Sequence, residues 1–152
     1  MKLFLKEKCN VNETEVEIRC VKRNSEVDSI IKGIKDAGTT LIGEKENGDI
    51  LQISVKDILY FEAVDRHVYA YLKNEVLRVK STLYDIELSY QELFFVRISK
   101  SFIVNIRDIN CIRPEDGRRV RLLLSNGEWL IVSKNYVSTL KKAIGMKGVG
   151  NE

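Results

Sequence analysis

FFVRISKSFIVN, residues 94–105, places a short polar break between two apolar runs. The break is Ser99-Lys100-Ser101, and the runs on either side are rich in Phe, Ile and Val, which suits the protein interior. A lysine in such a break lies at the surface between two buried anchors. The stretch therefore predicts a β domain with a cationic loop.

Short strand-like runs extend this pattern in both directions. They cover Thr40–Glu44, Asp49–Ile53, Ile58–Val64, Val68–Leu72, Glu75–Lys80, Phe94–Ile98, Ile109–Ile112, Val120–Leu124 and Trp129–Val132. Turn signals such as Asn47-Gly48 and Asn126-Gly127 separate many of them, which favours antiparallel pairing. Helices are expected after Thr82 and after Ser133, each of which can cap a first turn. We expect a mostly β domain with short helices over residues 39–147.

The first 38 residues predict a small α/β accessory segment of strand, strand and helix. Apolar and polar residues alternate from Glu15 to Arg23, and Leu3–Leu5 is a second apolar start. Ser25 then predicts the cap of an amphipathic helix of about ten residues. A segment of this size is too small to fold alone, so we expect it to pack on the domain or to form a homodimer contact. Residues 148–152 are expected to be a tail.

The overall composition is that of one folded domain, with 152 residues, 44% of them hydrophobic and 31% charged. Neither a membrane-spanning run nor a signal peptide is evident, so the expected compartment is the cytoplasm. The net charge of +3 is unevenly distributed, since residues 1–47 are neutral, residues 48–92 carry −3 and residues 93–142 carry +6. The third block would attract a polyanion.

The sequence contains few residues that could form a catalytic or metal site. Cys9, Cys20 and Cys111 form no Cys-x₂-Cys pair, and His67 is the single histidine of the sequence. Cys20 lies on the apolar side of its expected strand and is assigned to the core. No glycine-rich phosphate loop or nucleophile motif occurs. We therefore expect a protein that is not an enzyme and that holds no metal or cofactor.

Three polar breaks of the sequence carry a cation. They are Asp65-Arg66-His67, Ser99-Lys100-Ser101 and Ser133-Lys134-Asn135. The third is expected in the first turn of a helix, where free backbone N–H groups favour phosphate and where Lys and Asn can reach a base edge. Each break alone is an ordinary exposed turn, but three in one small β domain favour a surface for a polyanion.

Taken together, these motifs resemble the LytTR-type DNA-binding domain family. The resemblance rests on the run Asp57 to Ala63, on residues 95–105, on Asn126-Gly127 and on residues 131–136, which follow the family's order across about residues 40–145. It implies an elongated set of antiparallel β-sheets whose loops enter successive major grooves of double-stranded DNA without a recognition helix. The expected function is a sequence-specific transcriptional regulator.

The resemblance also implies contact residues. Base contacts would come from Arg66 or His67, from Lys100 and from Lys134. Independently of the resemblance, Arg118 and Arg119 after the Asp116-Gly117 turn are candidates for phosphate contacts. The other phosphate-contact candidates lie in or next to the polar breaks and are Arg97, Ser99, Ser101, Ser133 and Asn135. Because the family often has His at the position of Ser99 and Arg at those of Lys100 and Lys134, we expect a different base preference here.

The resemblance further implies partners. With about 40 residues before the domain and no room for a receiver domain, the chain is similar to stand-alone LytTR regulators, which are often paired genetically with a small membrane protein that restrains them. We expect tandem similar half-sites in DNA, a homodimer on that DNA and a possible membrane inhibitor. Two alternatives remain open. One is a protein-interaction module that sequesters a partner, and the other is RNA binding, although the aromatic residues lie mostly in apolar strand positions.

Overall fold

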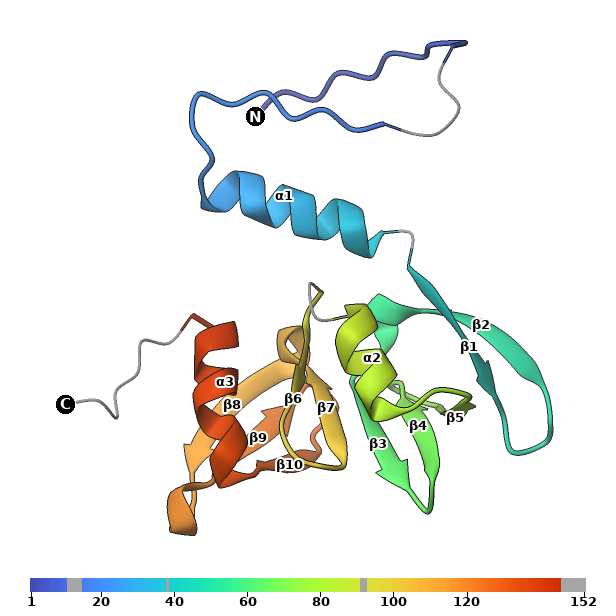
Figure 1. Ribbon diagram of the computed structural model, residues 1–152, viewed down its shortest axis with the longest axis vertical. Coiled ribbons are helices and arrows are strands. Elements are labelled where there is room, and N and C mark those ends of the chain that lie inside the picture. The colour runs from blue at the N-terminus through green and yellow to red at the C-terminus, as the bar shows by residue number, and fades with distance from the viewer. Residues whose placement is uncertain (11–14, 38, 91–92, 146–152) are drawn as a thin grey trace.

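The computed structural model describes residues 1–10, 15–37, 39–90 and 93–145. These residues form two antiparallel β-sheets and three α-helices, with the N-terminal segment and α1 at one end of the molecule (Figure 1). The expected fold class is therefore confirmed.

The larger sheet has seven strands in the order β2-β1-β5-β4-β3-β7-β6. They are β1 Thr40–Glu44, β2 Ile50–Ser54, β3 Tyr60–Val64, β4 His67–Tyr71, β5 Val76–Val79, β6 Phe95–Arg97 and β7 Phe102–Asn105. Strand β7 was not among the strands expected from the sequence. It pairs with both β3 and β6, so residues 94–105 fold as a hairpin that is joined to the rest of the sheet through β3.

The smaller sheet has three strands in the order β10-β9-β8. They are β8 Ile109–Pro114, β9 Val120–Leu124 and β10 Trp129–Val132. The α-helices are α1 Ser25–Asp36, α2 Leu83–Tyr90 and α3 Val137–Ala143, and 3₁₀ turns occupy η1 Val55–Asp57, η2 Ile106–Asp108, η3 Asp116–Arg118 and η4 Lys134–Tyr136.

Two buried clusters hold these elements together. Phe61 of β3 and Ile103 of β7 belong to a core that includes residues of α2, whereas Tyr60 and Val104, their neighbours in sequence, belong to a second core shared with the smaller sheet and Leu140 of α3. Successive residues of a strand point to opposite faces, so β3 and β7 contribute to both cores. This double use joins the two sheets.

A pair of stacked tyrosines reinforces the junction. The rings of Tyr60 and Tyr71 lie 4.3 Å apart, and their hydroxyls donate hydrogen bonds to Glu128 at 2.7 Å and to Glu62 at 2.6 Å. Burial and then the carboxylate partners raise the pKa of both phenols, that of Tyr71 to about 12, so both hydroxyls keep their protons well above neutral pH. The bond from Tyr60 to Glu128 ties β3 to the β9–β10 turn.

The segment before α1 differs from the sequence expectation. Neither Leu3–Leu5 nor Glu15–Arg23 is a strand, and Cys20 is exposed instead of buried. An alternating segment becomes a strand only when another strand supplies its hydrogen bonds, and none of the described strands pairs with residues 1–10 or 15–24. The alternation of polar and apolar residues from Glu15 to Arg23 is therefore not enough to make this segment a strand.

Of the three helix caps expected from the sequence, one agrees with the structure and two do not. The cap of α1 is Asn24 and not Ser25, because the Asn24 side chain accepts a hydrogen bond from a first-turn N–H. The cap of α2 is confirmed, since Asp85 N donates to Thr82 Oγ1 at 3.1 Å. The cap expected at Ser133 is wrong, because its side chain makes no capping bond and the chain first forms η4.

The close approach of β1 to β5 requires a glycine. A Cβ built on Gly43 would lie 2.7 Å from Cβ of the fully buried Leu77. We expect Gly43→Ala to lower the free energy of unfolding by about 1–3 kcal/mol through overpacking. Gly33→Ala in α1 is the control, because a Cβ there meets nothing within 4 Å and alanine favours a helix, so its stability should be unchanged or slightly higher. Urea denaturation of both variants checks this, and equal midpoints for the two would contradict it.

Candidate nucleic-acid interface

The β3–β4 turn holds Arg66 in an unusual backbone conformation. Asp65 and Arg66 have φ angles of 48° and 67°, and His67 pairs with Val64 across the hairpin. Two-residue turns of this kind normally use Asn-Gly or Asp-Gly, because a side chain is costly at positive φ. A strained non-glycine residue is a sign of a functional position, and Arg66 is also exposed to solvent.

This strain gives a prediction in which stability and binding move in opposite directions. We expect Arg66→Gly to raise the free energy of unfolding by about 0.5–1 kcal/mol, since glycine tolerates the left-handed region. The same change should weaken binding to a duplex selected by the protein. Chemical denaturation and fluorescence anisotropy measure the two effects, and a stabilised variant with unchanged DNA affinity would remove Arg66 from the site.

The β6–β7 loop is held by Arg97. Its Nε donates to the carbonyl of Ser99 at 2.8 Å, its Nη2 to the carbonyl of Lys100 at 2.6 Å, and its Nη1 to Glu87 of α2 at 2.9 Å. The side chain of Arg97 is only 18% exposed. Three of its donors are therefore committed to the loop and to α2.

The serines of this loop also shape it. Ser99 Oγ accepts hydrogen bonds from the backbone N–H groups of Ser101 and Phe102, both at 3.1 Å. These bonds and those from Arg97 fix the backbone on both sides of Lys100, whose own side chain is exposed. The loop thus presents one lysine from a rigid frame.

Two backbone hydrogen bonds fasten the β6–β7 loop to its neighbours. Ala63 N, near the end of β3, donates to Ser101 O at 2.9 Å, and Ser133 N donates to Ile98 O at 2.9 Å. Residues 65–67, 99–101 and 133–135, which we name the three basic loops, are thereby brought side by side. The β3–β4 turn and the β6–β7 loop point to the same, lower edge in Figure 1.

The remaining site candidates lie on the same side of the molecule. Lys134 and Asn135 are exposed in η4. Arg118 is exposed in the β8–β9 turn with a φ of 61°, and Arg119 Nε donates to Asp116 O at 3.2 Å. This turn also points to the lower edge in Figure 1. The β3–β4 turn, the β6–β7 loop and the β8–β9 turn thus point to one edge of the molecule. Backbone hydrogen bonds place the β6–β7 hairpin next to Ala63 of β3 and next to Ser133.

Several other arginines of residues 93–142 are engaged elsewhere. The guanidinium groups of Arg113 and Arg121 each lie 4.9 Å from the centre of the Trp129 ring, and Arg121 also pairs with Glu115. Arg107 lies 4.2 Å from the Phe94 ring. The net charge of +6 for residues 93–142 therefore overstates the positive charge that lies near the three basic loops.

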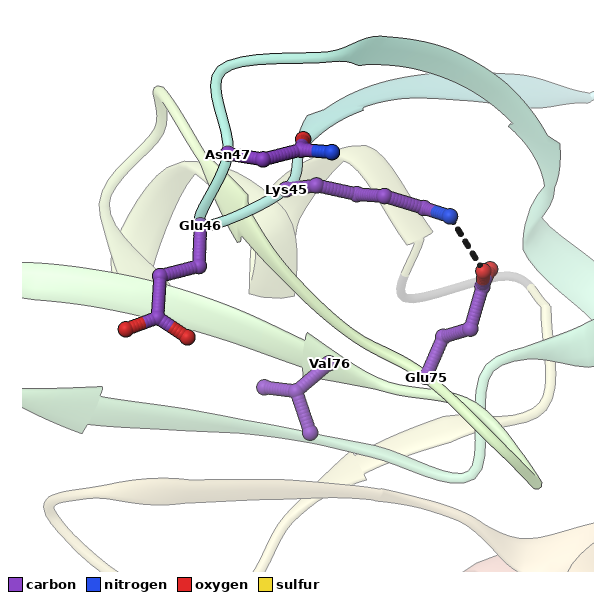
Figure 2. Close-up of a pocket in the computed structure, with 5 residues that line it drawn as sticks. All are labelled: Lys45, Glu46, Asn47, Glu75 and Val76. Atoms are coloured by element: carbon purple, nitrogen blue, oxygen red, sulfur yellow. Dashed lines mark ion pairs between the residues drawn. The ribbon is translucent and has the colours of Figure 1, made fainter.

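Two shallow hollows lie on the surface of the larger sheet. One, of about 410 Å³, is lined by Arg66, Arg78 and Lys80 among others. The other, of about 310 Å³, lies at Lys45, Glu46 and Glu75, and Figure 2 shows Lys45 Nζ paired with Glu75 Oε1 at 2.9 Å. The first hollow has an excess of positive charge, whereas the charges of the second are largely paired.

Other kinds of site find no support in the described parts of the chain. There, no three His, Cys, Asp or Glu side chains gather as metal ligands. Of the described helices, none has both the length and the apolar character needed to cross a bilayer.

Comparison with known proteins decides the family. The profile of the LytTr DNA-binding domain matches residues 48–145, which is more than half of the chain. The chain belongs to the LytTR family. A solved LytTr DNA-binding domain, from a methyl-accepting/DNA response regulator of Bacillus cereus, superposes with a TM-score of 0.66 and 27% identity, covering 71% of this chain and 98% of that domain.

Curated relatives of this LytTR protein extend over most of its length. An uncharacterised HTH-type transcriptional regulator of Staphylococcus aureus strain NCTC 8325 is 31% identical over 141 residues, covering 90% of this chain and 95% of that protein. A relative of the same description from strain MRSA252 is 30% identical over the same length. The similarity to these regulators therefore reaches beyond the matched domain.

Proposed function

We propose that this LytTR protein is a sequence-specific, double-stranded DNA-binding transcription regulator that reads the major groove through the three basic loops. Arg66 or His67 contacts bases from the first loop, Lys100 from the second and Lys134 from the third. Lysine and arginine donate well to guanine O6 and N7, which makes G·C pairs the expected targets. Family membership and the regulator relatives support DNA as the partner.

The observation that carries the proposal is the pair of bonds from Ala63 N to Ser101 O and from Ser133 N to Ile98 O. They hold three cationic loops from distant parts of the sequence at fixed relative positions. A rigid array of contacts is what base recognition requires, whereas non-specific attraction to phosphate needs only charge. In the described residues no two α-helices follow each other along the chain, as a helix-turn-helix would require.

The remaining candidates receive two different roles. Arg118 and Arg119 of the β8–β9 turn and Asn135 of the third basic loop hold phosphates of the duplex. Arg97, Ser99, Ser101 and Ser133 instead position the loop backbone through the hydrogen bonds described above, and in this role Arg97 acts on DNA through Lys100.

The proposal includes the way in which the protein assembles. Two copies bind tandem similar half-sites as a homodimer, with residues 1–38 as the candidate contact between them. The protein acts in the cytoplasm without catalysis, and a small membrane protein is the expected restraint.

Selection of duplexes from a random pool by the full chain tests this function. We expect enrichment of one motif that recurs at a fixed spacing, because rigid loops and paired half-sites impose both. A pool that remains unenriched while the protein is folded would contradict specific DNA binding and would favour partner sequestration.

A further inference from the structure

The hollow beside the β3–β4 turn lies in a part of the chain whose net charge is negative. It is lined by Arg66, His67, Arg78, Lys80, Thr82 and Asp85, among other residues, and its volume is about 410 Å³. Three cations and one carboxylate therefore face it. None of these three cations forms an ion pair within the described residues, although Glu44 is opposite Arg78 in the ladder between β1 and β5.

Strand register places this charge next to the first basic loop. The ladder between β4 and β5 pairs Val68 with Val79 and Tyr69 with Arg78, so Lys80 follows at the level of His67. Residues that are two apart in a strand share a face. Arg78 lies on the exposed face of β5, and Lys80, which directly follows β5, is also exposed and lines the same hollow. Leu77 and Val79, on the other side, are buried.

We infer that Arg78 and Lys80 form a second backbone-contact site, which holds phosphates of the same DNA duplex whose bases the first basic loop reads. The inference rests on the proposed function. Lys80 lies at the level of His67, and Arg78 lies two residue pairs further along the ladder, opposite Tyr69. A duplex whose groove receives the β3–β4 turn therefore brings its phosphates close to Arg78 and Lys80. Asp85, in the first turn of α2, is the one carboxylate that lines the hollow. Its single negative charge does not neutralise the three positive charges of Arg66, Arg78 and Lys80.

A matched pair of double variants tests the site. Arg78→Gln with Lys80→Gln removes the two charges, and Lys56→Gln with Lys73→Gln removes two exposed charges from η1 and from the β4–β5 turn, at the opposite end of the sheet. The readout is the affinity of the full chain for a selected duplex and for a scrambled duplex over a series of salt concentrations, with a thermal melt to compare folding.

We expect the first double variant to bind both duplexes more weakly by the same factor. The slope of log affinity against log salt should become shallower by about 0.9 for each phosphate contact that is lost. The control variant should keep the wild-type slope.

Two outcomes would overturn the site while leaving the proposed function intact. One is a wild-type slope in the first double variant, and the other is a loss confined to the selected duplex, which would indicate base reading. Failure of the unmodified chain to bind any selected duplex would instead remove the proposed function itself.

Discussion

Replacing Lys100 or Lys134 by alanine is expected to weaken binding to the cognate duplex by about 1–3 kcal/mol, which is roughly 5- to 150-fold in affinity. Both side chains are exposed and neither takes part in an ion pair among the described residues. Their removal therefore leaves the fold intact and deletes a donor that base edges require. Binding to a scrambled duplex should fall much less, since only charge is lost there.

The control for this pair is Lys73→Ala, which removes an exposed lysine from the β4–β5 turn, at the far end of the larger sheet. It should leave both affinities unchanged. Fluorescence anisotropy at one fixed salt concentration compares all three variants. Equal losses on cognate and scrambled DNA for Lys100→Ala and Lys134→Ala would mean that these lysines hold phosphates and do not read bases.

Arg97→Lys is expected to impair cognate binding almost as much as Lys100→Ala. Lysine keeps the positive charge but cannot reproduce the three hydrogen bonds to Ser99 O, Lys100 O and Glu87, because these need the planar guanidinium. The loop then loses the frame that presents Lys100. A phosphate contact would behave differently, since lysine binds phosphate well as a point charge.

A double-mutant cycle tests whether Arg97 acts through Lys100. If it does, the variant with both Arg97→Lys and Lys100→Ala should bind the cognate duplex no more weakly than Lys100→Ala alone. Scrambled DNA and the salt slope should be unaffected by Arg97→Lys. Additive losses, or full cognate affinity in Arg97→Lys, would rule out the positioning role.

The β domain could be predicted from the sequence because the signals for its strands and turns lie within short stretches of sequence. Alternation and Asn-Gly turns locate strands such as β1 and β9 to within a residue. The same alternation failed at Glu15–Arg23, since a strand also needs a partner and the described residues provide none. Strand β7 could not be separated from the preceding run in the sequence, because the break Ser99-Lys100-Ser101 contains no Gly, Pro, Asn or Asp to mark a turn.

The contact residues were harder to predict from the sequence, because the net charge of a stretch of sequence does not show which of its side chains lie together on the surface. Arg113 and Arg121 raise the count of their block but lie against Trp129. Arg78 and Lys80 lie in a block of net charge −3, yet pairing between β4 and β5 brings them beside His67. The signal that could have found them is the alternation over residues 77–80, in which the apolar Leu77 and Val79 are buried and the basic Arg78 and Lys80 are exposed.

The most direct test of DNA reading by this LytTR protein is the ratio of its affinities for a selected duplex and for a scrambled duplex of equal length and composition. We expect the full chain to prefer the selected duplex by a factor on the order of 10³ near physiological salt, and to retain a preference as salt rises. Equal affinity for the two duplexes at every salt concentration would contradict sequence-specific recognition by the three basic loops.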